Sequence, residues 1–508
     1  MQQKQNKMGV MPIPKLLLSM AIPLMLSLLV QSLYNIVDSI YVSRISEQAL
    51  TATSLAFPVQ MLMIALGVGT AVGINALLSR LLGQKKHDEV SRGAATGLVL
   101  AVLSSCIFIA VGLFFAGSIA HRMTADSNTA EMCAAYLRIV TLFCTGSFVE
   151  TMTQRFLQAS GKTGLSMISL AVGAVTNIIL DPIFIFTLNM GIRGAAIATV
   201  IGQWLGAVTA ILLNAFLNPE VKLSFRGFRL EIRMVKAIYK VGLPTIVMQA
   251  MGSVMTFGMN MILGAGTAVA FFGAYYKLQS FLFMPMNGLG QACLPVIGYN
   301  FGAKNTDRIG STIKTAVIWG ILIGLAGTIL FMTIPGTLLS MFNASPDLLA
   351  LGIPAVRIIC VTYALTAVTT VLGMCASGLG NGMINMIGTG LRQVIILLPC
   401  FALFKGLWNL DNVISPDSHA LTTSAKNGGT SFGGLPKRTP RRLAAEIPSD
   451  WRFFMFSRSF SATKLRICRT RSAMKVPMRS LPYRVSSRGI SKTQRSAFIS
   501  LVRICHCD

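Results

Sequence analysis

Long apolar runs alternate with short polar segments from the N-terminus to about residue 404. A helix of about 20 mostly apolar residues crosses the hydrocarbon core of a bilayer, and each run reaches about that length. We expect eleven spans, near residues 16–36, 53–78, 94–119, 134–154, 165–187, 194–216, 241–264, 270–297, 312–335, 350–375 and 384–404. The pattern therefore predicts an all-α polytopic membrane protein.

The composition agrees with this prediction. Of the 508 residues, 53% are hydrophobic and only 12% are charged, whereas soluble domains are about 25% charged. The ten cysteines are scattered without metal-ligand spacing, so we expect buried thiols, with "CHC" at Cys505–Cys507 as a weak metal alternative. No cofactor and no structural metal are expected.

The net charge of +27 raises the question of a nucleic-acid partner. The basic residues of the spanning part, however, cluster in alternate loops, as cytoplasmic loops of membrane proteins do. The residues that show this are Lys4, Lys7 and Lys15; Arg80, Lys85, Lys86 and Arg92; Arg155 and Lys162; Lys222 to Lys240; and Lys304, Arg308 and Lys314. We therefore expect a cytoplasmic N-terminus, a lipid bilayer as the main partner, and no nucleic acid.

Four short motifs recur at offsets of 217 to 221 residues. The pairs are "AIPLMLSLLVQ" and "GLPTIVMQAMG", "LLGQKKHDEV" and "NFGAKNTDRI", "QASGKTG" and "CASGLGNG", and "NIILDPIFIF" and "VIILLPCFALF". Because each unit holds an even number of spans, both copies enter the membrane in the same direction. We expect two six-helix bundles related by a pseudo-two-fold axis along the membrane normal, as in transporters built from parallel repeats.

The repeat sets the expected domain boundaries. Residues 1–216 form an N-lobe of six spans, 217–240 a basic cytoplasmic linker, and 241–410 a C-lobe with five recognisable spans. From 411 to 508 the chain holds 18 Lys or Arg and 5 acidic residues, and no run there could span a bilayer. A twelfth helix is thus missing or replaced. We interpret 411–508 as a disordered or frame-shifted tail; the alternative is a basic tail that binds RNA or anionic lipid.

A polar stripe interrupts the first span. Gln31, Tyr34 and Asp38 are spaced i, i+3 and i+7 and share one helix face, with Asn35 beside them. A carboxylate at the centre of a spanning helix costs about 2.5–3.5 kcal/mol, so such residues face the bundle interior and mark ion or substrate pathways. We expect this stripe to face a cavity.

A second aspartate, Asp181, stands in "NIILDPIFIF". Asn177 precedes it by one helical turn, and Pro182 follows it. Proline cannot donate a backbone hydrogen bond, which favours a local kink whose freed carbonyls can help to coordinate an ion. Amides and hydroxyls that only join helices are the alternative reading of the polar neighbours.

At these residues the chain resembles the multidrug and toxic compound extrusion (MATE) family of efflux transporters. The resemblance rests on "YNIVDSIYVSRIS", "GLPTIVMQ", the paired "QASG" and "CASG", and "NIILDPIFIF" with "MGIRGAAIATVIGQ", and it covers about residues 10–410. It implies twelve helices in two lobes around a central cleft. It also implies export of drugs or metabolites, many of them cationic, driven by entry of sodium ions or protons across a bacterial inner membrane.

The resemblance also implies a set of site residues. In the branch of the family with an N-lobe ion site, the polar cluster falls here on Gln31, Tyr34, Asp38, Asn177, Asp181 and Thr199. The C-lobe positions opposite Asp38 and Asp181 read Met259 and Leu398, which favours coupling through the N-lobe only. Whether the coupling ion is a proton or sodium stays open.

From these residues we predict secondary active efflux of organic cations. Burial disfavours the charged form of a carboxyl group, so Asp38 and Asp181 are suited to bind a proton; with Asn177 and Thr199 they could instead hold sodium. The driving ion and a cationic cargo then compete for the same negative charge.

Three further charged residues lie in or beside the spans. Lys277 either lines the cavity or extends to the membrane surface, and both readings stay open. Glu150 and Arg155 are expected to form a structural ion pair or to extend to the membrane surface, with ligand binding as the alternative.

A flippase and an intramembrane enzyme are the two alternative functions for a membrane protein of this kind. A flippase for lipid-linked saccharides has a related architecture, but it favours basic residues in the cavity. An intramembrane enzyme needs a nucleophile–base pair or a metal cluster, yet all four histidines (His87, His121, His419 and His506) fall in loops or in the tail. We therefore expect a transporter rather than an enzyme, and a monomer.

Overall fold

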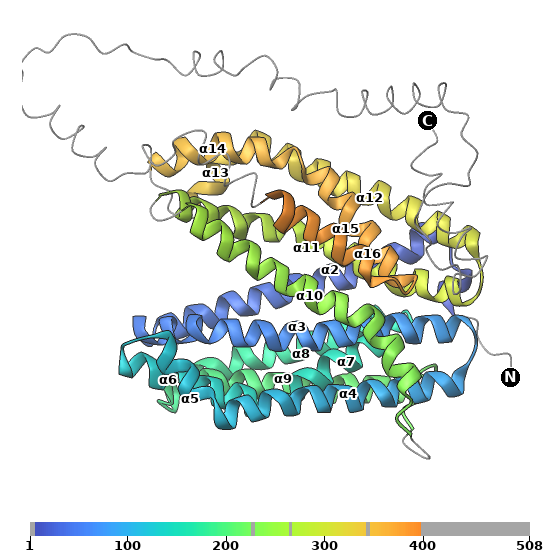
Figure 1. The fold of residues 1–508 in the computed structure, drawn as a ribbon, viewed down its shortest axis with the longest axis horizontal. Helices are drawn as coiled ribbons and strands as arrows, with labels where there is room; N and C mark the ends of the chain where they lie inside the picture. The colour runs from blue at the N-terminus through green and yellow to red at the C-terminus, as the bar shows by residue number, and fades with distance from the viewer. Residues whose placement is uncertain (1–5, 225–228, 264–266, 342–345, 398–508) are drawn as a thin grey trace, which may run out of the picture. The chain divides into compact units, whose positions relative to one another are not determined.

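The computed structural model describes residues 6–224, 229–263, 267–341 and 346–397. These residues form helices with no strand among them, which confirms the all-α fold (Figure 1). The end of the eleventh predicted span, Leu398, the predicted absence of a twelfth helix, the tail 411–508 and the "CHC" motif lie outside the described residues.

The first half of the chain forms nine α-helices and one π-helical turn among the described residues. They are α1 (Lys7–Val10), α2 (Ile13–Ser43), α3 (Glu47–Gly83), α4 (His87–Phe114), α5 (Ala116–Met123), α6 (Ser127–Leu142), α7 (Thr145–Ala159), α8 (Thr163–Pro182), η1 (Ile183–Thr187) and α9 (Gly191–Leu217). The long apolar runs of the sequence thus lie on helices.

The second half repeats this order. It contains α10 (Ile232–Leu263), α11 (Thr267–Gly302), α12 (Thr306–Thr333), α13 (Pro335–Ser340), α14 (Pro346–Cys360), α15 (Tyr363–Gly378), α16 (Gly382–Gly390) and η2 (Leu391–Leu397). Residues 47 and 267, where α3 and α11 begin, are 220 apart, and residues 87 and 306, where α4 and α12 begin, are 219 apart. The helices therefore recur at the offset found among the sequence motifs.

The described part of the chain includes seven single helices that are long and apolar enough to cross a membrane, and two bent helix pairs that each suit one span. One bent pair is α6 and α7, which meet at 47° where the sequence predicts one span at 134–154. Trp204 of α9 donates its Nε1 hydrogen over 3.2 Å to the Phe143 carbonyl at this break. The Gly146 backbone N–H also donates to this carbonyl, over 3.4 Å, so the tryptophan adds a second hydrogen bond at the break.

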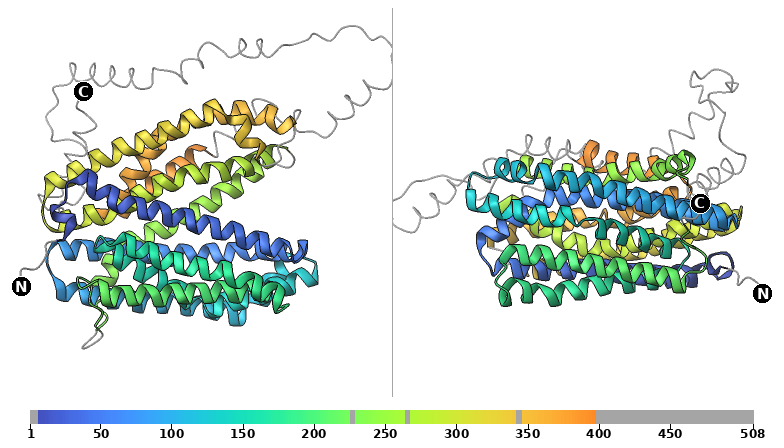
Figure 2. Two further views of the ribbon diagram at one scale, coloured as in Figure 1. Left: turned by 180° about the vertical axis from the view of Figure 1, so that it is seen from behind. Right: turned by 90° about the horizontal axis from the view of Figure 1, so that it is seen from below.

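Helix α2 packs against both halves of the chain. Its buried residues Leu16, Met20 and Leu24 share a core with α11, α12 and α15, whereas α8 also lies along α2. Figure 1 and the left view of Figure 2 both show α2 between the helices of the two halves. A helix that belongs to the N-lobe by sequence therefore packs against helices of both lobes.

Glycines allow the helices of the two halves to touch. A Cβ atom at Gly73 of α3 would lie 2.2 Å from the Ile238 carbonyl oxygen of α10, and one at Gly83 would lie 1.9 Å from the Tyr299 carbonyl oxygen of α11. A Cβ at Gly302 of α11 would lie 2.0 Å from the Arg80 carbonyl oxygen. We call this contact of α3 with α10 and α11 the seam. It joins the second half of α3 to the start of α10 and the end of α11.

Candidate ion-coupling site

Asp181, Asn177 and Thr199 meet where α8 packs against α9. Asp181 is fully buried and Asn177 nearly so. The Nδ2 atom of Asn177 donates to Asp181 Oδ1 over 3.3 Å and lies 3.4 Å from Thr199 Oγ1. The structure therefore brings together three of the four residues predicted for ion coupling, and one amide links the other two.

Small residues explain why α8 and α9 come this close. A Cβ atom at Gly202 would lie 2.8 Å from the Gly173 carbonyl oxygen and 3.2 Å from the Cβ of Asn177. Glycine on both helices lets the backbones touch, a common device in membrane bundles. This contact places Thr199, one turn before Gly202, beside Asn177.

Pro182 shapes the other end of the site. It is the last residue of α8, and the π-helical turn η1 follows it directly. Because proline has no N–H to donate, the regular ladder cannot continue unchanged past it. The helix therefore changes from α to π directly after Pro182, but it continues to Thr187 as one helix suited to a single span and is not among the bent helix pairs.

Asp38 lies on α2, which packs along α8. Its carboxylate is near enough to act electrostatically on Asp181. Asp38 itself is half-buried, and its Oδ1 atom is enclosed without a hydrogen-bond partner in the described structure. The two aspartates thus lie on two helices that pack against each other, α2 and α8.

Several oxygens of this cluster have no donor. Asp38 Oδ1, Asp181 Oδ2 and Asn177 Oδ1 are buried and accept no hydrogen bond from any described group, and so is Gln203 Oε1, one turn after Thr199. Buried acceptors are nearly always paired, so such a group of exceptions calls for an explanation. Carboxylate and amide oxygens suit a proton or a hard cation.

The other predicted cavity residues fall into two groups. Tyr34 is half-buried and lies close enough to feel the charges of Asp38, Asp181 and Glu150. Gln31 and Asn35 are exposed on α2, so Tyr34 rather than Asn35 shares the surroundings of Asp38. Lys277 is exposed on α11, and no described contact brings it to the cluster.

The interpretation of Glu150 and Arg155 as an ion pair is wrong. The Nη1 atom of Arg155 donates to Gln158 Oε1 over 2.8 Å and to Gln291 Oε1 of α11 over 2.9 Å. Glu150 instead accepts from Gln154 Nε2 over 3.1 Å. The residues are five apart on α7, so their side chains leave the helix on different sides, and each finds a neutral partner there.

Glu150 is therefore a residue whose place the sequence reasoning missed. Its carboxylate fits against α9 at Gly206, where a Cβ would lie 2.4 Å from Glu150 Oε1, and its charge acts on Tyr34. The sequence singles Glu150 out only because few acidic residues lie within the spans. Its contact with a glycine of another helix could not be predicted from the sequence.

Tyr136 and Gln60 were also missed. Gln60 Nε2 of α3 donates to the buried Tyr136 hydroxyl of α6 over 3.2 Å, and the charges of Asp38 and Asp181 act on that hydroxyl. Neither residue is unusual in a spanning helix, so the sequence carried no signal for them. With them the polar cluster draws on α2, α3, α6, α7, α8 and α9.

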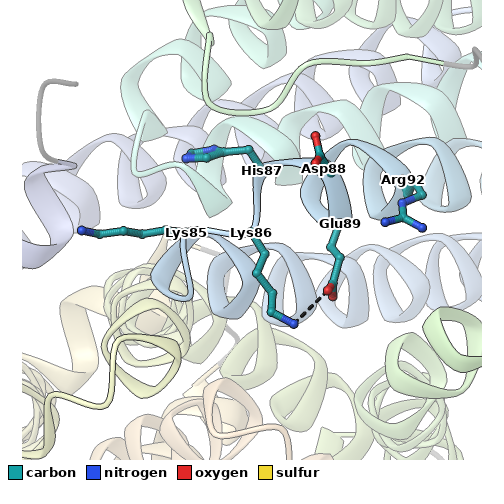
Figure 3. A pocket seen from close by; sticks show the side chains of 6 residues that line it. All are labelled: Lys85, Lys86, His87, Asp88, Glu89 and Arg92. Carbon is teal, nitrogen blue, oxygen red and sulfur yellow. Dashed lines mark hydrogen bonds and ion pairs between the residues drawn. The ribbon is translucent and has the colours of Figure 1, made fainter. Parts of the chain in front are cut away.

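A hollow of about 310 Å³ lies elsewhere, at the turn from α3 to α4. Lys85, Lys86, His87, Asp88, Glu89 and Arg92 line it (Figure 3). Lys86 pairs with Glu89 over 2.8 Å, and Arg92 pairs with Glu231 over 2.9 Å. It contains none of the predicted site residues, and we interpret it as a solvated loop. Within the described ranges no three His, Cys, Asp or Glu side chains gather as metal ligands.

Known proteins resemble this chain over most of its length. The multidrug export protein MepA of Staphylococcus haemolyticus is 25% identical over 406 residues, which cover 79% of this chain and 89% of that protein. MepA of Staphylococcus aureus is also 25% identical, over 409 residues covering 79% and 90%. These relatives are named as export proteins, not as enzymes, in agreement with the sequence prediction.

Solved structures agree. A MOP superfamily transporter from Pyrococcus furiosus matches with a TM-score of 0.75 at 25% identity, covering 80% of this chain and 91% of that one. A multidrug resistance MATE family transporter in an outward-facing conformation matches with a TM-score of 0.74 at 25% identity and the same coverage. The MatE family model matches residues 23–183 and 244–402, one match in each half. The chain therefore belongs to the MatE family, the family of multidrug and toxic compound extrusion transporters.

Proposed function

We propose that this protein exports organic cations from a bacterial cell by exchanging them for an incoming proton or sodium ion. The observation that carries the proposal is the N-lobe cluster, in which Asp38, Asp181 and Asn177 hold buried oxygens that accept no hydrogen bond from the described part of the chain. The family supports export as the activity, and relatives named for multidrug export support a broad range of cargo.

The cluster suits competition between two cations. The only described hydrogen bond to the fully buried Asp181 comes from neutral Asn177, and the neighbouring Asp38 adds negative charge. Two carboxylates this close repel each other unless a cation or a proton intervenes. An incoming ion relieves that repulsion and at the same time removes the charge that holds a cationic cargo. Coupling therefore needs no contact between ion and cargo.

The described contacts between the halves support alternating access. Gly73, Gly83 and Gly302, where backbones touch, all lie in the part of the seam near the α3–α4 and α11–α12 turns. With a cytoplasmic N-terminus, these turns face the cell interior, and the seam closes the inner end of the path. We propose that the two bundles rock about the cluster, in a monomer, between this state and one open to the cytoplasm.

The flippase alternative has less support. It requires basic residues that meet a pyrophosphate in the cleft, whereas the charges that interact in the described cluster are the acidic Asp38, Asp181 and Glu150. Lys277, the basic residue predicted for the cavity, is exposed, and no described hydrogen bond or ion pair links it to them.

Export by cells that produce the protein tests the proposal. Asp38→Asn and Asp181→Asn should each abolish efflux of a fluorescent organic cation such as ethidium, because the neutral amide can no longer bind the driving ion. Asp307→Asn makes the same chemical change on the exposed first turn of α12 and should leave efflux unchanged. Immunoblots of the membrane fraction establish equal amounts of protein. Full efflux by Asp181→Asn would refute ion coupling through this cluster.

A further inference from the structure

The segment Asn6–Met11, which we call the clasp, lies ahead of the first long helix and touches both halves of the chain. It contains the single helical turn α1. Met8 at its centre has no exposed surface, and it belongs to the core that α2 forms with α11, α12 and α15. A terminal segment is usually mobile unless something ties it down, so its burial requires a reason.

The second half of the chain holds the clasp through Arg308 and Asn300. The Nη2 atom of Arg308 donates to the Met8 carbonyl over 3.0 Å and to the Met11 carbonyl over 2.7 Å. Asn300 Nδ2 donates to the same Met8 carbonyl over 3.2 Å, and Asn300 Oδ1 accepts from Arg308 Nε over 3.2 Å. A guanidinium thus satisfies carbonyls that a short helix leaves open at its C-terminal end.

The first half holds the clasp through Asn6. Its Nδ2 atom donates to the Ser160 carbonyl over 3.1 Å and to the Glu220 carboxylate. Its Oδ1 atom accepts from the Met8 backbone N–H over 2.8 Å, so the same side chain also caps α1. The Gly161 backbone leaves so little room that a Cβ there would lie 3.3 Å from Met8 Cγ.

The clasp therefore joins the two halves at the end of the molecule where the seam closes. A Cβ at Gly9 would lie 3.2 Å from the ring of Tyr299, the residue whose carbonyl meets Gly83 of the seam. Separation of α3 from α11 at this end stretches the clasp, which must release either Arg308 or Asn6.

We propose that residues Asn6–Met11 are a latch that stabilises the state with a closed seam and must let go on one side before the seam opens. This inference rests on the alternating access of the proposed function. One planar guanidinium holds the C-lobe side of the clasp, because Nη2 of Arg308 donates to both carbonyls while Nε donates to Asn300, and the single ammonium nitrogen of a lysine cannot reproduce all three bonds in this geometry.

The test measures opening of the seam in the purified full-length protein in lipid nanodiscs. Ser79 is completely buried on α3 and faces Gly298 of α11, where a Cβ would lie 3.1 Å from the Ser79 Cβ. In a protein that carries Ser79→Cys, the rate of maleimide labelling at this position reports how often the seam opens. The same protein without Ser79→Cys gives the background from native thiols.

Arg308→Gln and Arg308→Lys should each raise the labelling rate about tenfold, because charge-assisted hydrogen bonds that hold only the closed state are lost. Asn6→Ala, on the other half, should also raise it. Lys314→Gln removes an exposed charge from the same helix as Arg308 and should leave the rate unchanged. If Arg308→Gln does not fold, the labelling rate of the Asn6→Ala variant tests the latch in its place.

An unchanged rate in the clasp variants that fold, or an equal increase in Lys314→Gln, would overturn the latch. Labelling needs neither cargo nor an ion gradient. The latch can therefore fail while Asp181→Asn still abolishes export, and export coupling can fail while the latch is confirmed.

Discussion

Two charged residues of the N-lobe, the buried Asp181 and the half-buried Arg155, differ in the hydrogen-bond partners that surround them. Arg155 donates to two glutamine oxygens, one from each half of the chain, and so has a structural explanation. Asp181 accepts from one amide and keeps a buried oxygen without a donor. A carboxylate in a spanning helix that no described group neutralises is the stronger mark of an ion pathway.

Part of this contrast was predictable from residue types. Asp38, Asp181 and Asn177 stand out because each is polar within an apolar run, and the i, i+4 spacing placed Asn177 beside Asp181. The spacing could not assign partners between helices, so Gln291 of α11 as the partner of Arg155 was not foreseen. The close approach of the Glu150 carboxylate to Gly206 was not foreseen either.

At this scale Thr199 gives a graded test. Thr199→Ala removes the hydroxyl that lies 3.4 Å from Asn177 Nδ2, whereas Thr199→Ser keeps it. A hydrogen bond of this kind contributes about 0.5–1.5 kcal/mol, so we expect Thr199→Ala to lower the initial rate of export by about two- to tenfold. Thr199→Ser should retain most of the rate. Equal rates in the two variants would show that the hydroxyl has no part in coupling.

At the scale of helices, close approach depends on small residues. Most of the predicted spans became single helices, because a long apolar run with few charges has no other stable form in lipid. The span at 134–154 forms two helices instead, since hydropathy averaged over a window cannot detect a short break, nor the hydrogen bond from Trp204 to the Phe143 carbonyl at that break. A disturbance of the helix at Pro182, here a π-helical turn, was predictable because its cause, the missing N–H of proline, is local.

The seam makes a prediction about helix packing. Gly83→Ala places a methyl group where the Tyr299 carbonyl oxygen lies 1.9 Å away, so α3 and α11 must move apart. Overpacking of this kind costs about 1–3 kcal/mol, and the melting temperature of the detergent-solubilised protein should fall. Gly310→Ala on α12 meets nothing within 4 Å and should melt at or slightly above the temperature of the unchanged protein. Identical melting of both variants would contradict the packing described for the seam.

At the scale of the whole molecule, the duplication was predictable because both copies retain short motifs at one offset, and the helices recur at that offset. The packing of α2 against both halves was not predictable from the sequence. A repeat defines two covalent units, but packing decides which residues touch, and Leu16, Met20 and Leu24 lie in a core with second-half helices. The basic segment 411–508 stays a prediction, because it lies outside the described residues.

The central claim is that cation entry through the N-lobe cluster drives export, and separate ion gradients across proteoliposomes test it most directly. Purified protein is reconstituted, and a pH gradient or a sodium gradient is imposed alone while uptake of an organic cation against its concentration is followed. The account predicts that at least one of the two gradients drives uptake, and that the same gradient drives none with Asp181→Asn. Uptake that neither gradient changes would contradict the account, and so would equal gradient-driven uptake by the Asp181→Asn variant.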